Sequence, residues 1–250
     1  MTTRKKIVIV GATSAIALHT ARIWAQEGHK DFVLIGRDLT RLNRIETDLS
    51  ARGLDNRVQI REASFLDPAA IQRLLTDIAM SGSVDVALVA HGSLSDQARA
   101  QRDLQYGQEE LLINGVSAVV FAEAFATQME LNDRGTIAVL GSVAGDRGRK
   151  SNYVYGAAKG LVTRYMQGLQ HRFAGTGVKV VLIKPGPTET PMTASLTASG
   201  IKMASVDDVA KGVALAIERG QSEAYVPGKW WLIMMIIRHL PRFVFNKMNI

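Results

Sequence analysis

Short runs of apolar residues alternate along the chain with longer segments in which apolar residues recur at helical spacing. The short runs predict strands at residues 7–10, 32–35, 58–60, 84–89, 136–140 and 179–183, with a weaker seventh at 224–226. Because these runs are rich in β-branched residues and lack polar alternation, they are typical of strands buried on both faces of a parallel sheet. The segments between them predict helices, including 16–28, 39–52, 69–80 and 108–131.

The order of these elements predicts the fold class. Strands that alternate with helices form a doubly wound parallel sheet with right-handed crossovers and helices on both faces. We therefore expect an α/β protein, with a three-layer Rossmann-type sheet in one domain over residues 1–226 and an apolar, basic C-terminal segment over 227–250. In such sheets ligands bind at the carboxyl ends of the strands, near the point where the strand order reverses.

Composition narrows the chemistry. The chain has 250 residues, of which 47% are apolar, which suffices for one large domain. It has no cysteine, which excludes disulfides and thiolate metal sites, and its five histidines are scattered without ligand spacing, so we expect no metal. No segment resembles a signal peptide, and no run approaches the roughly 20 apolar residues that span a bilayer. We therefore expect the body of the protein to be cytoplasmic.

The net charge of +7 suggests acidic ligands, anionic lipid or nucleic acid, or else a solvated basic surface. Nucleic acid has the least support, because the positive charge is not gathered on a recognisable module. We expect no nucleic-acid partner.

A candidate nucleotide loop follows the first strand and opens the first helix, over residues 10–17. Gly11 permits a tight turn, and the hydroxyls of Thr13 and Ser14 can bind phosphate or ribose. Free N–H groups at the helix start, around Ala15 and Ile16, suit a pyrophosphate. Ala15 stands where a glycine is expected, which would restrict the approach of the backbone.

The end of the second predicted strand bears on the choice of cofactor. An acid at this point binds the ribose 2′-hydroxyl of NAD, whereas an arginine favours the 2′-phosphate of NADP. Gly36 takes the place of the acid and Arg37 supplies the cation, so the sequence favours NADP(H). Asp38 could still reach the ribose, which keeps NAD(H) as an alternative. The alternative without a cofactor is that Arg37 and Asp38 are a solvated ion pair at the start of a helix.

A tyrosine and a lysine lie four residues apart after the fifth predicted strand. On a helix, Tyr155 and Lys159 would share one face, with Cβ atoms about 6 Å apart. A neighbouring ammonium favours the phenolate, so we expect it to lower the pKa of Tyr155. Ser142 lies just after the strand, where its hydroxyl can approach the phenol. Alone, this spacing also fits a surface tyrosine packed on a lysine stem.

Further motifs follow in register with this pair. They are Asn114 in Ile-Asn-Gly, Ser142, Tyr155-Gly-Ala-Ala-Lys159, and Pro185-Gly186 with Thr188 and Thr190. Together with the loop at 10–17, they resemble the short-chain dehydrogenase/reductase family in their order and spacing. The resemblance implies an NAD(P)-dependent enzyme that interconverts a carbonyl and an alcohol.

The resemblance also implies roles for four residues. Tyr155 would be the general acid in carbonyl reduction and the base in the reverse direction, and Lys159 would lower the pKa of Tyr155 and hold the nicotinamide ribose. Ser142 would polarise the substrate carbonyl, and Asn114 would maintain a helix kink and a water chain to Lys159. A developing alkoxide needs a proton donor and a second hydrogen bond, which agrees with these roles.

Other positions are implied to contact the cofactor. Thr188 and Thr190 would orient the nicotinamide carboxamide, beside Pro185 and Gly186. The chain departs from the family at two points where side-chain contacts are usual and where we expect backbone contacts instead: Ser64 and Phe65, and Ala90, His91 and Gly92.

Two features concern the substrate. Between Ser142 and Tyr155 lie three cations, Arg147, Arg149 and Lys150, which suggest a phosphate or carboxylate on the substrate. An exposed basic loop or an interface contact explains them equally well.

The second feature is the C-terminal segment, where no acid follows Glu223 and two tryptophans precede an apolar helix that Pro241 ends. This pattern suits contact with an anionic membrane surface. A lid on the pocket or a contact with another subunit are the structural alternatives.

The tail and the stretch 142–159 resemble the decaprenylphosphoryl 2-keto-pentose reductases of the same family. The resemblance implies reduction of a keto-sugar on a polyprenyl phosphate carrier, in cell-envelope biosynthesis at the inner face of the membrane. The alternatives are a reductase of 3-oxoacyl, steroid or other hydrophobic ketones, and a regulator that binds a dinucleotide without catalysis. The family resemblance implies a homodimer or homotetramer through helices near 108–131 and 153–174.

Overall fold

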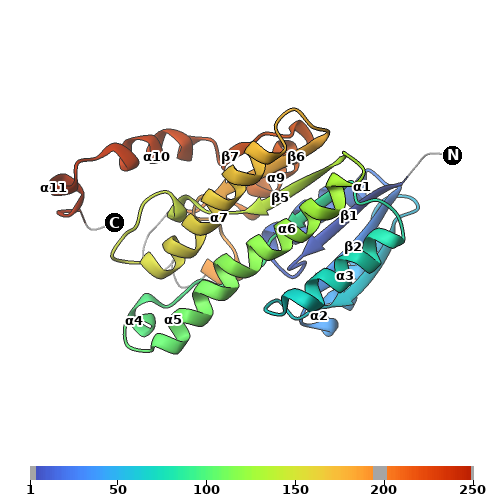
Figure 1. Cartoon of the computed structure of the whole chain (residues 1–250), viewed down its shortest axis with the longest axis horizontal. Helices are drawn as coiled ribbons and strands as arrows, with labels where there is room; N and C mark the ends of the chain where they lie inside the picture. Colours follow the sequence, from blue (N-terminus) through green and yellow to red (C-terminus); the bar gives the residue numbers. More distant parts are fainter. Residues whose placement is uncertain (1–3, 194–201, 249–250) are drawn as a thin grey trace.

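A seven-stranded parallel sheet forms the centre of the molecule, with strand order β3-β2-β1-β4-β5-β6-β7 (Figure 1). The computed structural model describes residues 4–193 and 202–248. The strands are β1 (Lys5–Val10), β2 (Lys30–Gly36), β3 (Arg57–Glu62), β4 (Val86–Val89), β5 (Gly135–Leu140), β6 (Val178–Pro185) and β7 (Glu223–Val226). The order reverses between β1 and β4, which places a ligand crevice at the carboxyl ends of these two strands.

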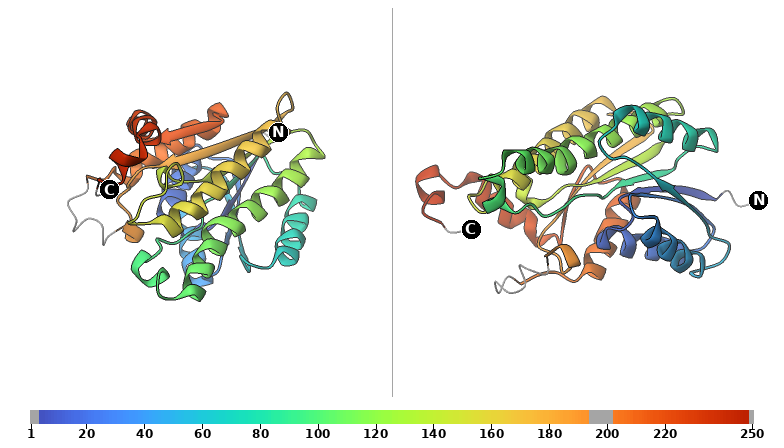
Figure 2. Two further views of the ribbon diagram at one scale, coloured as in Figure 1. Left: turned by 60° about the vertical axis from the view of Figure 1, so that its left-hand side comes forward. Right: turned by 90° about the horizontal axis from the view of Figure 1, so that it is seen from below.

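Helices cover both faces of the sheet (Figure 2). They are α1 (Ala15–Gln26), α2 (Leu39–Ser50), α3 (Pro68–Met80), α4 (Gln97–Ala100), α5 (Leu104–Leu111), α6 (Ser117–Glu130), α7 (Tyr153–Arg172) and α9 (Val206–Arg219). One apolar core lies between the sheet and α3, α6 and α7, and a second lies between the sheet and α1, α2 and α9. Adjacent residues of β1 contribute to opposite cores, because successive strand side chains point to opposite faces.

The three-layer doubly wound sheet is confirmed, and all seven predicted strands are present. The expectation of burial on both faces is wrong for β3, whose residues are exposed or partly buried. As the edge strand it pairs only with β2, so it lacks a neighbour on its other side. The predicted helix over 108–131 is α5 and α6 joined by a π-helical turn, Leu112–Val116.

The helical stretch Leu104–Glu130 is long and apolar enough to cross a bilayer by length and composition. It is the core helix of this fold, since 61% of its most apolar window is buried inside the protein. Its apolar residues are explained by packing on the sheet.

The C-terminal segment forms two helices, α10 (Lys229–His239) and α11 (Arg242–Phe245), separated at Pro241. Both lie at the end of the molecule toward which the strands point (Figure 1). Met234 is buried, whereas Trp231, Leu232 and Ile236 are each more than half exposed. The helix therefore packs on the domain through one side and leaves an apolar face uncovered.

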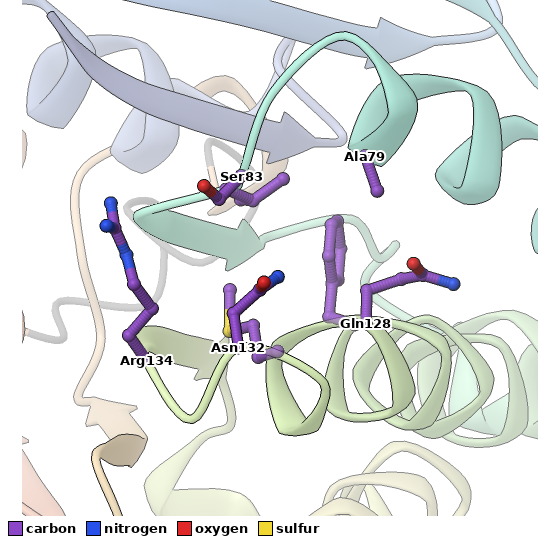
Figure 3. A pocket seen from close by; sticks show the side chains of 8 residues that line it. Ala79, Ser83, Gln128, Asn132 and Arg134 are labelled. Atoms are coloured by element: carbon purple, nitrogen blue, oxygen red, sulfur yellow. The ribbon is translucent and has the colours of Figure 1, made fainter.

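A small cavity of about 160 Å³ lies near the amino ends of β4 and β5, at the other end of the strands (Figure 3). Ser83, Asn132 and Arg134 line it, just before β4 and β5 begin. Because doubly wound sheets bind ligands at the carboxyl ends of their strands, the functional site lies elsewhere.

Candidate active site

A second cavity, of about 180 Å³, opens at the carboxyl ends of the strands. Most of the predicted site residues line it: Ser14, Ile16, Ala90, His91, Gly92, Ser142, Arg149, Tyr155, Lys159, Pro185, Gly186, Thr188 and Thr190. The structure thus brings together segments separated by more than 170 residues in the sequence. Gly11, Thr13, Ala15, Arg37, Asp38, Ser64, Phe65, Asn114, Arg147 and Lys150 do not line this cavity.

The turn after β1 depends on a glycine. Gly11 has φ +76°, and a Cβ built there would lie 2.6 Å from Cβ of His91. Its N–H donates to the carbonyl oxygen of Ile35 at 2.8 Å, which fixes the turn against β2. At the helix start that follows, the side chain of Ser14 makes no capping bond, unlike the aspartates that begin α2, α3, α4 and α5. The first N–H groups of α1 therefore remain for an anionic ligand.

The two charged residues after β2 differ in whether the side chain already has a hydrogen-bonding role. The carboxylate of Asp38 caps α2 by accepting a hydrogen bond from the N–H of Arg41 at 3.0 Å. Arg37 is exposed, and its guanidinium carbon lies 5.7 Å from the ring centroid of Phe65. Asp38 is thus committed to the helix, whereas the charge of Arg37 faces solvent beside the cleft.

The unusual residues Phe65 and His91 pack into the core. Their ring centroids are 4.7 Å apart, and Phe121 lies against both. His91 Nε2 lies 2.9 Å from the hydroxyl of Ser117, and burial lowers the pKa of His91 to about 3, so the ring is neutral at physiological pH. Ser64 is exposed. The side chain of His91 therefore packs in the core, and the expected backbone contact with the cofactor stays a prediction.

The chain places Ser142 at the end of β5 and Tyr155 in the first turn of α7. The Ser142 hydroxyl lies near enough to the phenol of Tyr155 to affect its pKa, and Ser142 Oγ accepts the N–H of Ala144 at 3.1 Å. Burial raises the pKa of Tyr155, and the hydroxyl of Ser142 opposes this rise only in part. The expected lowering by Lys159 is therefore not found in this structure, because desolvation of the phenol dominates. At neutral pH Tyr155 carries its proton.

Lys159 is buried beside the tyrosine. Its Nζ lies 5.9 Å from the ring centroid of Tyr155 and donates to the carbonyl oxygen of Leu140 at 3.0 Å. Burial lowers the pKa of Lys159 from 10.5 to about 8. The ammonium therefore persists at neutral pH but is close to titration.

This burial predicts a pH-dependent stability difference for Lys159→Met. The folded pKa of Lys159 is about 8 and the unfolded value is 10.5, so the unfolded chain binds more protons between these limits and wild-type stability rises with pH across them. Below pH 8 the variant avoids a burial cost of about 3 kcal/mol but loses a hydrogen bond worth about 1 kcal/mol. We expect it to be the more stable protein at pH 7 and to lose that advantage by pH 10.

Urea denaturation of both proteins at pH 7 and pH 10 measures this difference, since other titrating groups cancel between them. A free-energy difference that does not change with pH would contradict the buried-ammonium interpretation.

Asn114 lies in the π-helical turn between α5 and α6 and is completely buried. π-Helical turns are often found at functional sites, and this one matches the kink implied for the residue. Its Oδ1 accepts the N–H of Ser93 at 2.8 Å. Ser93 and Leu94 line the cavity and were not predicted, because nothing in their local sequence distinguishes them from an ordinary loop.

The segment after β6 forms the far wall of the cavity. Thr188 is buried and donates its hydroxyl to the carbonyl oxygen of Gly186 at 2.9 Å, while Thr190 Oγ1 lies 3.1 Å from that of Thr193. The indole of Trp230 packs directly on Gly186, where a Cβ would clash with it. The C-terminal segment therefore supports the cavity wall, as one of the structural alternatives proposed.

The basic loop divides into residues with different roles. Arg147 donates to the carbonyl oxygens of Ile237 and Leu240, and its guanidinium stacks 3.8 Å from the ring centroid of Phe245. It therefore binds the carboxyl end of α10, where the helix dipole favours a cation. The expectation that it faces the substrate is not met. Lys150 is exposed.

Arg149 alone of the three cations lines the cavity. Its Nε is buried and lacks a hydrogen-bond partner among the described residues, and its Nη2 contacts only the sulfur of Met234, at 3.7 Å. Asn152 also lines the cavity, and its buried Oδ1 has no hydrogen-bond partner among the described residues. The cavity therefore presents an unsatisfied cationic donor near Tyr155.

Sequence reasoning missed a buried ionic cluster behind this loop. Lys184 Nζ lies 2.7 Å from Asp146 Oδ1, with side chains only 1% and 2% exposed, and 3.1 Å from Glu223. Tyr225 donates its hydroxyl to Asp146 Oδ2 at 2.7 Å, and burial raises the pKa of this tyrosine. A lysine inside the apolar run of β6 was the available signal, since a buried charge requires a partner.

A doubly wound sheet that brings a glycine turn, a serine, a tyrosine and a buried lysine together at the carboxyl ends of its strands defines an oxidoreductase of the nucleotide-binding α/β class. The sequence profile of the short chain dehydrogenase family matches residues 5–200. The chain belongs to this family.

Relatives and solved structures agree with this assignment. An uncharacterized oxidoreductase of Streptomyces coelicolor is 31% identical over 98% of this chain and 96% of its own. An uncharacterized oxidoreductase of Mycobacterium tuberculosis is 32% identical over 97% of this chain and 96% of its own. A short-chain dehydrogenase from Sphingobium yanoikuyae in complex with NADPH shares the fold, with a TM-score of 0.76, 21% identity, and coverage of 98% and 96%.

Proposed function

We propose that the protein reduces a ketone with NADPH, with Tyr155 as the proton donor. The observation that carries this proposal is that Ser142, Tyr155 and the buried Lys159 lie together on the wall of the cavity at the strand ends. A bound nicotinamide dinucleotide supplies the hydride to the carbonyl carbon. The residues of this chain supply the proton and the second hydrogen bond that the developing alkoxide needs.

Each member of the site has a task in this reaction. The Ser142 hydroxyl, fixed by the N–H of Ala144, holds the carbonyl oxygen beside the phenol. Tyr155 delivers its proton to that oxygen, which it can do because burial keeps it protonated at neutral pH. The ammonium of Lys159 then stabilises the phenolate that remains.

The residues that follow β1 and β2 fit a phosphorylated dinucleotide. The turn at Gly11 and the uncapped start of α1 suit a pyrophosphate. The exposed Arg37 suits a 2′-phosphate, whereas Asp38 is committed to the cap of α2. We therefore favour NADP(H) over NAD(H).

The substrate that we propose is a keto-sugar on a polyprenyl phosphate carrier. The buried Nε of Arg149, which has no hydrogen-bond partner among the described residues, supports an anionic group on the substrate, since a buried donor is costly until it is paired. The exposed apolar residues of α10 at the same end of the molecule support a lipid chain. Family members form oligomers, and we propose a homodimer or homotetramer.

The test is NADPH oxidation by the purified protein with a polyprenyl-phosphoryl keto-pentose, against a panel of soluble ketones and 3-oxoacyl thioesters, repeated with NADH. We expect turnover of the lipid-linked sugar and faster turnover with NADPH. Arg149→Met should raise KM for the anionic substrate and leave KM for neutral ketones unchanged. Turnover of soluble ketones alone contradicts the lipid-linked substrate, and binding of NADPH without any turnover contradicts the enzyme.

We also propose that the C-terminal segment contacts an anionic membrane surface at the cytoplasmic face. The exposed apolar side chains Trp231, Leu232 and Ile236 support this contact. So do four exposed cations with no acid among them: Lys229, Arg238, Arg242 and Lys247. Apolar side chains enter the headgroup region while cations bind anionic lipid.

Co-sedimentation with vesicles measures this contact. We expect Trp231→Asp with Ile236→Asp to weaken binding to vesicles with anionic lipid by at least about 10-fold. Leu54→Asp, at a site 78% exposed on another surface, is the matched control and should bind as wild type. If the double variant instead dissociates an oligomer and binds vesicles normally, the face is a subunit interface.

A further inference from the structure

A buried carboxylate lies directly behind Asn114. Glu110, in α5, is only 9% exposed, and its Oε2 accepts the amide Nδ2 of Asn114 at 2.9 Å. The hydroxyls of Ser93 and Ser95 donate to the same oxygen at 2.9 Å and 2.6 Å. No salt bridge reaches Glu110 among the residues that the structure describes, so neutral donors alone compensate its charge. A carboxylate held in this way at a protein interior implies a use for it.

The carboxylate determines which way the Asn114 amide points. Nδ2 faces Glu110, which accepts only, and Oδ1 faces the N–H of Ser93, which donates only. A flipped amide would set oxygen against the carboxylate and N–H₂ against the N–H of Ser93. Both contacts would be repulsive, so Glu110 allows one orientation.

In that orientation the Asn114 oxygen lies on the same side of Gly92 as Lys159. A Cβ built on Gly92 would lie 2.8 Å from Asn114 Oδ1 and 3.8 Å from Lys159 Nζ. The amide oxygen and the ammonium therefore both lie near one point beside Gly92. An oxygen on this side attracts the ammonium, directly or through a water, whereas an N–H₂ group would repel it.

The helix geometry brings Glu110 and Asn114 together. Glu110 and Asn114 are four residues apart and face each other across the junction of α5 with the π-helical turn. Ser93, which bonds to both, lines the cavity beside Tyr155. A continuous hydrogen-bonded path thus runs from the cavity wall through Ser93 and Asn114 to Glu110.

We propose that Glu110 is a positioning residue for carbonyl reduction. It holds the Asn114 oxygen toward Lys159 and thereby keeps the ammonium aligned with Tyr155. This role rests on the proposed reductase function. Glu110 itself does not line the cavity and acts only through Asn114 and Ser93.

Glu110→Gln tests the role with almost no change of shape. A glutamine amide can donate or accept, so it no longer enforces the orientation of Asn114, which then depends on the N–H of Ser93 alone. We expect kcat to fall about 10- to 100-fold, as for residues that orient a catalytic group, with KM for ketone and for NADPH within about twofold of wild type. Glu110→Asp keeps the charge and should recover part of kcat. Glu109→Gln, at the exposed neighbouring position, is the matched control and should leave kcat unchanged.

A double-mutant cycle separates positioning from general stabilisation. If Glu110 acts through Asn114, adding Glu110→Gln to Asn114→Ala should cost no further kcat. Additive losses, or a Glu110→Gln variant with wild-type kcat, overturn the proposal. So does a loss of kcat that merely follows a lower melting temperature and that Glu110→Asp does not reverse. Absence of turnover in the wild type would instead reject the proposed reductase function.

Discussion

We expect Tyr155→Phe to lower kcat by about 10²- to 10⁴-fold, the range for loss of a positioned general acid. Phenylalanine keeps the ring and removes only the hydroxyl, so the walls of the cleft and the helix start at α1 are unchanged. The variant should therefore bind NADPH with nearly wild-type affinity. The loss falls on the chemical step because the developing alkoxide no longer receives a proton.

Steady-state kinetics with the best ketone of the panel, together with fluorescence titration of NADPH, measures these two effects. Tyr153→Phe is the matched control, since Tyr153 begins the same helix but is 44% exposed and does not line the cavity. It should retain wild-type kcat. Reduction by Tyr155→Phe at more than about a tenth of the wild-type rate would contradict the assignment of Tyr155 as the acid.

The strands could be predicted closely because burial on both faces imposes a visible pattern. Residues 7–10 and 32–35 are continuous apolar runs because both faces of β1 and β2 touch a core. The pattern misled at β3, where Val58 and Ile60 flank the polar Gln59 on an exposed edge strand. Strand order was not visible locally, since it depends on which helices cover which face.

The site was predictable where its members lie close in sequence or follow strand ends. Tyr155 and Lys159 are neighbours on one helix, and the carboxyl ends of parallel strands bring Ser142 and Gly186 to the same edge. Contacts that depend on tertiary packing were not predictable. Arg147 binds carbonyl oxygens 90 or more positions away, and a backbone acceptor leaves no trace in the sequence.

The direction of the pKa change at Tyr155 also could not be predicted from the sequence. Spacing predicted an ammonium near the phenol, but it did not reveal how completely both groups are desolvated. In this structure burial outweighs the attraction and raises the pKa of the phenol. The protonated tyrosine is the form that donates a proton in reduction, whereas oxidation of an alcohol requires the phenolate.

The loop between Ser142 and Tyr155 owes its position to the ionic cluster behind it. Asp146 ties the loop to β6 through Lys184 and to β7 through Tyr225. Arg147, the next residue, joins the same loop to α10. The loop between Ser142 and Tyr155 is thus held by residues that do not line the cavity.

We therefore expect Lys184→Met to be strongly destabilising. The substitution leaves Asp146 buried with the hydroxyl of Tyr225 and the charge of Arg149 to compensate its own, and removing one partner of a buried pair costs about 3–5 kcal/mol. Adding Asp146→Asn should restore part of the loss, because the stranded charge is then removed. Urea denaturation at pH 7 gives the free energy of unfolding of the wild type and of both variants.

An exposed salt bridge provides the comparison for the buried pair of Lys184 and Asp146. Arg99 and Asp103 are joined at 3.3 Å but are 60% and 42% exposed, so Arg99→Met should cost less than about 1 kcal/mol. A similarly small loss for Lys184→Met would show that Asp146 regains water or a new partner. The loop would then be held by Arg147 and Tyr225 rather than by the buried ion pair. A large loss that Asp146→Asn does not relieve would mean that Lys184 stabilises the strand through packing of its stem.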